Sequence, residues 1–157
     1  MSRRDQIRMD HDEVLAFFAA QKVINVATIG PNGRPHVAPL WYFPQGDKLA
    51  TWTYGSSQKM ANLRRLPEAT VLIEDGDSYE TLRGVSMETD VEILEDTDVV
   101  ASMGVSLMQR YAGGGPGDPA ADELTAFIRA QAAKRVGLIF TPTKTVTWDH
   151  RKLGGVY

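Results

Sequence analysis

The chain has 157 residues, 43% of them hydrophobic, which is enough for one core of ordinary domain size. Its formal net charge of −3 argues against a nucleic-acid-binding protein, because affinity for a phosphate backbone requires clustered lysine and arginine. It contains no cysteine, which excludes disulfides, thiol nucleophiles and iron–sulfur clusters, so any redox chemistry requires a cofactor.

The N-terminal sequence MSRRDQIRMD lacks the apolar segment of a secretory signal, and no apolar run approaches membrane-spanning length. We therefore expect a cytoplasmic protein with no membrane association. The sequence has no repeat, no low-complexity tract and no visible domain boundary. We expect residues 1–157 to form a single domain.

The first predicted element is a helix that begins after Asp10. Asp10 is a suitable N-cap, and Glu13 completes a capping box three residues later. Val14, Phe17 and Phe18 fall on one face of this helix, so we expect it to cover an apolar opening.

Three short strands follow, over residues 23–29, 35–43 and 48–54, with turns rich in Gly, Pro, Asn and Asp between them. Asn32-Gly33 is the strongest hairpin signal in the chain. The pattern predicts an antiparallel meander that begins a barrel or closed sheet.

The strand over residues 35–43 is apolar or aromatic on both faces. Such a strand has two surfaces to cover, here a barrel interior and either a partner subunit or a flat ligand. Pro39 cannot donate a hydrogen bond to a neighbouring strand, so it indicates a sheet edge or a bulge.

The stretch from Thr51 to Asp77 reads as a strand end, a polar turn, a helix from about Ser57 to Leu66, and another strand. A helix N-terminus offers free N–H groups, and a hydroxyl and an ammonium beside it suit a bound phosphate. Lys59 shares the apolar side of the helix with Leu63 and Leu66, whereas a solvated lysine would lie on the opposite face.

An ordinary serine N-cap explains the same residues, and the pattern of Thr53, Tyr54, Ser56, Ser57 and Lys59 alone favours that explanation. The aromatic side chains on neighbouring strands shift the balance towards a ligand site, because they could form a flat pocket: Trp41, Tyr42, Trp52 and Tyr54. Arg64 and Arg65 point away from the apolar stripe and are interpreted as a solvated C-terminal turn that Pro67 ends.

A strand over residues 68–75 and a longer one from Tyr79 to Leu94 come next. The longer strand alternates between apolar odd positions and acidic even positions, which predicts one buried and one wet face. Arg83 falls on the buried face, where we favour a structural pair with a carboxylate over a ligand contact.

Two helices are predicted over residues 95–111 and 121–134. The segment AGGGPGDPAA between them is interpreted as a flexible connection, because a P-loop would need a preceding strand and a following GK[ST]. Alternating apolar residues predict two final strands, one around Val136 to Phe140 and another around Val146 to Trp148.

Direct catalytic chemistry is not indicated. The three histidines, His11, His36 and His150, lie in different elements without metal-ligand spacing, so we expect no metal. No nucleophile motif or acid–base pair is visible, and we assign no catalytic residue.

The sequence resembles the FMN-binding split β-barrel family, which includes pyridoxamine 5′-phosphate oxidases and the actinobacterial flavin/deazaflavin oxidoreductases. The motifs that carry the resemblance are Ser57-x-Lys59-x-x-Asn62-Leu63-Arg64, followed by Pro67 and a strand, and the ending Trp148-Asp149-His150-Arg151-Lys152-Leu153-Gly154. They are most similar to the B group of deazaflavin-dependent enzymes. The resemblance covers nearly the whole chain.

The resemblance implies a mainly β fold with peripheral helices, of α+β class: a six- to seven-stranded antiparallel split β-barrel that forms a homodimer. It implies coenzyme F-420, or alternatively FMN, in a cleft at the dimer interface. By this resemblance Ser57 and Lys59 hold the cofactor phosphate, with Gln58 beside them. The ring and ribityl chain contact Val37, Ala38, Pro39, Leu40, Trp41, Thr53 and Tyr54, and the partner subunit contributes Trp148 and Arg151.

The sequence departs from the family pattern at two places, one at the phosphate contact and one at the substrate signature. Many relatives carry arginine where this chain has Ser57, so one cationic contact is missing or comes from Arg64, Arg65 or Arg151. The terminal substrate signature of true pyridoxamine-phosphate oxidases is also absent, which counts against vitamin B6 oxidation.

The resulting hypothesis is an oxidoreductase in which reduced F-420 passes hydride to a small organic substrate. The alternatives are an FMN-binding flavoprotein of the same fold and a protein that binds or sequesters a cofactor without turnover.

Overall fold

The computed structural model describes residues 1–112 and 121–155. The predicted flexible connection after Ala112 lies outside the described residues. The helices are α1 (Arg3–Gln6), α2 (His11–Ala20), α3 (Gln58–Arg65), α4 (Thr97–Ala112) and α5 (Ala121–Ala132), with 3-10 turns η1 (Tyr79–Thr81) and η2 (His150–Leu153). The strands are β1 (Val23–Ile29), β2 (Pro35–Trp41), β3 (Phe43–Gln45), β4 (Lys48–Tyr54), β5 (Glu68–Asp75), β6 (Arg83–Leu94) and β7 (Arg135–Asp149).

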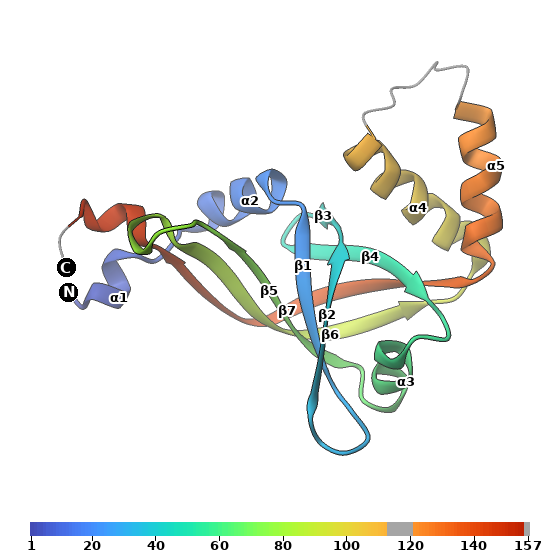
Figure 1. Ribbon diagram of the computed structural model, residues 1–157, viewed down its shortest axis with the longest axis horizontal. Helices are drawn as coiled ribbons and strands as arrows, with labels where there is room; N and C mark the ends of the chain where they lie inside the picture. Colours follow the sequence, from blue (N-terminus) through green and yellow to red (C-terminus); the bar gives the residue numbers. More distant parts are fainter. Residues whose placement is uncertain (113–120, 156–157) are drawn as a thin grey trace.

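One seven-stranded antiparallel sheet, in the order β2-β1-β5-β6-β7-β4-β3, curls into a half-barrel that carries the helices (Figure 1). This confirms the predicted α+β fold and its strand number. The β1–β2 hairpin turns at Asn32-Gly33 as expected, where Gly33 adopts a φ of 78° that favours glycine. α1 and η2 lie at one end of the molecule, and α3, α4 and α5 lie at the other. In the described part of the chain, no helix is both long and apolar enough to cross a membrane.

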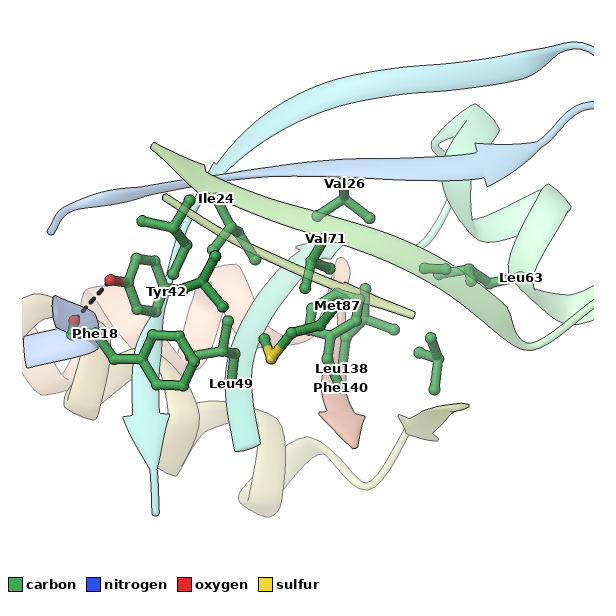
Figure 2. Close-up of a cluster of buried hydrophobic side chains, with 14 of the residues drawn as sticks. Phe18, Ile24, Val26, Tyr42, Leu49, Leu63, Val71, Met87, Leu138 and Phe140 are labelled. Atoms are coloured by element: carbon green, nitrogen blue, oxygen red, sulfur yellow. Dashed lines mark hydrogen bonds between the residues drawn. The ribbon is translucent and has the colours of Figure 1, made fainter. Parts of the chain in front are cut away.

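The core fills the concave side of the curled sheet. Ile24, Val71, Met87 and Leu138, from four different strands, are all at most 1% exposed (Figure 2). These side chains follow the two-residue period of their strands, because alternate residues face the same side of a sheet. The odd positions from Val85 to Val91 are buried as predicted and the acidic even positions are exposed, whereas Arg83 and Ile93 at the two ends of β6 are half-buried.

The helix α2 covers one opening of the barrel, as its apolar face predicts. Asp10 and Glu13 form the expected capping box, and Phe17 and Phe18 enter the core. The hydroxyl of Tyr42 donates to the carbonyl of Phe18 at 2.6 Å, and burial raises the pKa of Tyr42 to about 12. Tyr42 therefore ties α2 to the sheet as a neutral donor.

The convex side of the sheet is covered at one end by α4. Met103 and Leu107 pack against Phe43, Ala50 and the ring of Trp52. Gly104 lets the helix approach closely, because a Cβ at this position would lie 2.4 Å from Cζ3 of Trp52. This contact makes α4 a wall of the region beside β4.

The predicted strand over residues 35–43 is in fact two strands. β2 ends at Trp41, Tyr42 turns into the core, and β3 begins at Phe43, so Pro44 and Gln45 belong to a strand and not to the turn. The hydroxyl of Tyr111 accepts from the backbone N–H of Tyr42 at 3.0 Å, which satisfies a group that strand pairing leaves free. Pro39 lies on the edge strand β2, as its missing donor predicts.

The predicted strand from Tyr79 begins later than expected. Residues Tyr79–Thr81 form the 3-10 turn η1, because Ser78 and Thr81 bond to each other's backbone N–H groups and tighten the turn. β6 starts at Arg83, whose guanidinium donates to Asp75 at 2.7 and 3.0 Å. This bidentate pair confirms the structural role predicted for Arg83 and holds the pKa of Asp75 below its usual range.

The two predicted C-terminal strands are one continuous strand, β7. The pairing shifts by one residue, from Thr89 with Pro142 to Glu88 with Lys144, so Thr143 is the extra residue of a β-bulge. The bulge also exchanges the two faces: Leu138 and Phe140 are core residues, but Trp148 pairs with Gly84 on the outer face and covers it.

Candidate cofactor site

The N-terminus of α3 carries an unpartnered hydroxyl. Ser57 is the N-cap residue by its backbone, and its carbonyl accepts from the N–H groups of Met60 and Ala61. Its side chain makes no capping hydrogen bond, and the buried Oγ has no partner among the described residues. The contact that defines an ordinary serine cap is therefore missing, which favours the alternative that the hydroxyl serves a ligand.

Lys59 is buried at the same place. It is 9% exposed, and its Nζ donates to Thr53 Oγ1 at 3.1 Å. Within the described residues no carboxylate pairs with it, and burial lowers its pKa. A buried ammonium without a counter-ion is unfavourable in the free protein, and a bound anion would relieve that cost.

The position of α3 is fixed by buried polar and apolar contacts. Asn62 donates to Thr28 Oγ1 on β1 at 3.0 Å and accepts from Gln58 Nε2 at 2.9 Å. Met60 and Leu63 enter the core on the same side. These contacts attach α3 to the sheet along the length of the helix and so fix the position of Ser57 at its N-terminus.

Two strand edges lie open beside this helix. β2 is an edge strand. β4 pairs with β3 over Lys48–Ala50 only, so residues 51–54 of β4 pair with β7 on one side and are unpaired on the other. A cavity of about 250 Å³ lies between these edges, lined by Pro39, Leu40, Trp41, Thr51, Trp52, Thr53, Tyr54, Leu107, Met108 and Arg135. Unpaired backbone groups beside aromatic rings suit a planar ligand with polar edges.

A larger cavity, of about 640 Å³, lies between the N-terminal segment and β7. Its charged lining residues, which include Arg8 and Asp10, are exposed. It contains none of the residues that the sequence predicts for the site. The smaller cavity is the better candidate because buried polar groups flank it.

The three arginines named above as possible replacements for the missing cation, Arg64, Arg65 and Arg151, all have partners in the structure. Arg64 donates to Gly55 O at 2.8 Å and pairs with Glu95 at 3.2 Å. Arg65 donates to the carbonyl of Ile29. Arg151 forms a bidentate pair with Asp149, at 2.9 and 2.6 Å, which keeps the pKa of Asp149 low. Arg64 and Arg65 are exposed as expected, but both also hold the ends of neighbouring elements.

The structure brings most of the predicted residues together. Pro39, Leu40, Trp41, Thr53 and Tyr54 line the cavity, with Val37 and Ala38 on the same edge strand. Ser57, Gln58 and Lys59 follow at the start of α3.

Trp148 and Arg151 are not part of this group within one chain. β7 passes Tyr54 at Arg135 and reaches Trp148 thirteen residues later, on the order of 40 Å away along an extended strand.

Two polar residues near the site were not predicted. Arg135 lines the cavity and pairs in register with Tyr54, a proximity that only the β4–β7 register reveals. His36 pairs with Thr28 and so shares the face on which Asn62 lies; its Nδ1 is also buried without a partner among the described residues. No sequence motif marks either residue.

Comparisons with known proteins identify the family of the chain and structures of the same fold. A sequence model of the pyridoxamine 5′-phosphate oxidase family matches residues 10–148. The structure of a conserved hypothetical protein, Rv2991, from Mycobacterium tuberculosis has 38% identity, covers 100% of this chain and 95% of that one, and gives a TM-score of 0.88.

Two more distant structures share the fold. An F-420 reductase has 24% identity over 83% of this chain and 93% of its own, with a TM-score of 0.63. A putative 5-nitroimidazole antibiotic resistance protein from Bacteroides thetaiotaomicron has 13% identity over 90% of this chain and 84% of its own, with a TM-score of 0.71. No curated protein gives a significant match.

Proposed function

The chain belongs to the pyridoxamine 5′-phosphate oxidase family, and from that premise we propose that it is an oxidoreductase that uses the deazaflavin coenzyme F-420. The reaction would transfer hydride to a small organic substrate. The deazaflavin supplies the hydride chemistry when bound, which agrees with the lack of an acid–base pair or nucleophile motif in the sequence.

The residues of the site fit such a cofactor. Lys59, the Ser57 hydroxyl and the free N–H groups of α3 would hold the phosphate. The cavity beside Trp41 and Tyr54 would hold the ring. These residues would orient the ring, exclude water from one side of it and neutralise the anionic tail.

The charge at the phosphate site is the observation that favours F-420 over FMN. Among the described residues Lys59 is the one buried cation at the start of α3, and Arg64 beside the turn is already paired with Glu95. The proposed phosphate site therefore offers about one positive charge. The ribityl phosphate of F-420 is a diester with one negative charge, whereas the monoester of FMN carries about −1.5 to −2 at pH 7. A single buried ammonium matches the diester.

A homodimer completes the proposal. Val37 is 61% exposed and Trp41 is 52% exposed on the edge strand β2, which leaves an apolar surface beside the cavity. We propose that a second copy covers this surface and that the site also receives Trp148 and Arg151 of the partner subunit. The site would then be complete only in the dimer.

Titration of the purified protein with F-420 and with FMN, followed by the fluorescence of the cofactor and of tryptophan, tests the proposal. We expect F-420 to bind at least about tenfold more tightly, the effect of roughly one unbalanced charge contact. Tighter binding of FMN would overturn the cofactor assignment.

Glu95→Gln is the matched variant for the charge argument. It releases Arg64 from its carboxylate partner and should improve FMN binding more than F-420 binding. An equal effect on both cofactors would contradict the charge match. A tight F-420 complex that reduces no acceptor in a panel of quinones, nitroaromatics and enones would favour a sequestering protein instead.

A further inference from the structure

Arg135 is a cation held at the wall of the cavity. Its guanidinium carbon lies 4.2 Å from the centre of the Tyr54 ring and 4.6 Å from that of Trp52. Its Nη1 donates to Gln131 Oε1 at 2.5 Å and to Gln131 O at 3.3 Å. Two aromatic faces and one glutamine on α5 thus fix the side chain in a single orientation.

Most of the donors of Arg135 have no partner among the described residues. An arginine has five N–H groups, and within the described residues only Nη1 donates. No carboxylate among those residues pairs with it. The structural arginines of this chain differ in this respect: Arg83 and Arg151 have bidentate carboxylate partners, and Arg110 donates to four backbone carbonyls.

Arg135 and Lys59 serve different parts of the site. Lys59 bonds Thr53, whereas Arg135 stacks on Tyr54, and adjacent residues of a strand point to opposite faces. The two cations therefore lie on opposite sides of the free edge of β4. A phosphate at Lys59 leaves the guanidinium of Arg135 available to another group.

From this arrangement we propose that Arg135 binds the anionic oxygen of a planar, conjugated ligand in the cavity, such as the carboxylate of an unsaturated or aromatic acid. The apolar and aromatic walls, with Pro39, Trp41 and Met108 among them, suit the conjugated body, and the fixed planar guanidinium suits a carboxylate. The proposal specifies the substrate class and rests on the function proposed above. An ionised oxygen on the cofactor ring has the same chemistry and is the second possible source.

The test compares trans-cinnamate with trans-cinnamamide, which have the same shape but differ in charge, by calorimetry on cofactor-free protein. We expect the wild type to bind the acid at least about tenfold more tightly than the amide, as for a charge-assisted contact. Arg135→Gln should abolish this preference, and Arg135→Lys should retain part of it. Arg129→Gln, which removes an exposed arginine paired with Asp98, is the matched control and should keep the preference.

A second titration measures F-420 affinity in the same variants and identifies the source of the anion. A loss confined to the acid assigns Arg135 to substrate, and a tenfold loss of F-420 affinity in Arg135→Gln assigns it to the cofactor ring. Either result supports the proposal. Equal binding of acid and amide by the wild type, together with unchanged F-420 affinity in Arg135→Gln, overturns it.

The outcome is separable from the proposed function. If F-420 fails to bind the wild type while the preference for the acid depends on Arg135, the proposed function fails and this inference stands. Thermal denaturation of each variant shows whether it is folded, and Arg135→Lys provides a second variant should Arg135→Gln prove unstable.

Discussion

Individual residues at the start of α3 carry polar groups whose burial is costly in the free protein, which is the arrangement expected of the proposed anion site. Lys59 is buried with a hydroxyl as its partner, and the Ser57 hydroxyl is buried without one. Both arrangements are unfavourable in a free protein and become favourable when an anion binds. Stability and affinity should therefore respond in opposite directions when Lys59 is replaced.

Lys59→Met should weaken F-420 binding by about 1.5–3 kcal/mol, the range for a charge-assisted hydrogen bond, and leave the free protein as stable or up to about 2 kcal/mol more stable. Calorimetry and urea denaturation measure the two effects, with the exposed Lys48→Met as control. A variant that loses stability and keeps its affinity would show that Lys59 is a structural residue.

The stability difference between wild type and Lys59→Met should also depend on pH. Burial lowers the pKa of Lys59 in the folded state below its ordinary value of 10.5, so between these two values the unfolded chain binds more protons than the folded one. The cost of the buried charge is fully present below the folded pKa and disappears as the pH rises towards 10.5. Urea denaturation at pH 7 and pH 10 should therefore show a smaller difference at pH 10; a constant difference would mean that the ammonium is not penalised.

Ser57→Ala separates the two interpretations of that serine. Because its Oγ caps no backbone N–H, the substitution should change stability by less than about 0.5 kcal/mol but weaken F-420 binding by about 1 kcal/mol. Asp10→Ala removes a true capping box and should cost about 1 kcal/mol of stability without affecting the cofactor. Equal destabilisation by both substitutions would show that the Ser57 side chain acts as an ordinary N-cap.

The elements around the cavity explain how far the sequence could predict this site. Thr53, Ser57 and Lys59 are close in sequence, so the alternating strand pattern, the polar turn and the helix signal were enough to predict that these three residues lie together. Arg135 could not be found in the same way, since its position beside Tyr54 depends on the pairing of strands about eighty residues apart. No local turn signal predicts that residues 35–43 form two strands, because Tyr42 turns inward through its contacts with α2 and Tyr111.

The packing of α4 on β4 can be tested at Gly104. Gly104→Ala gains up to about 1 kcal/mol of helix propensity but places a methyl group against the rigid ring of Trp52 and against Ile128, which typically costs about 1–3 kcal/mol. We expect a net loss of stability in urea denaturation and a change in tryptophan fluorescence. Ser102→Ala, at an exposed position of the same helix, should show neither effect; if both variants behave alike, α4 does not set the shape of the cavity wall.

At the scale of the whole molecule, the half-barrel leaves the apolar side chains of Val37 and Trp41 exposed on its edge strand, beside the candidate site. The fold and strand number were predictable from alternation, turns and family resemblance, and the structure confirms them. The distance between the cavity and Trp148 could not be predicted, because it depends on residues 135–149 forming one continuous strand, β7. A second copy of the chain would explain both the exposed apolar edge and the remote C-terminal motif.

Val37→Asp tests this association, since it places a charge on the exposed edge strand without disturbing the core. We expect the wild type to sediment as a dimer and the variant as a folded monomer with at least about tenfold weaker F-420 binding, because part of the site is lost. Gln45→Asp, on the opposite sheet edge β3, should remain dimeric. A wild type that stays monomeric at all concentrations would exclude the shared site.

The bulge at Thr143 also has a consequence for how this chain should be compared with its relatives. Thr143 is one added residue, and the residues after it keep the strand partners that they would have without it. A homologue lacking this residue would therefore still present the residue aligned with Trp148 to the outer face when the gap is placed at position 143, and residues 144–149 should keep their polar and apolar pattern across such a gap. An alignment that places the gap elsewhere would match residues of opposite orientation, even where their identities agree.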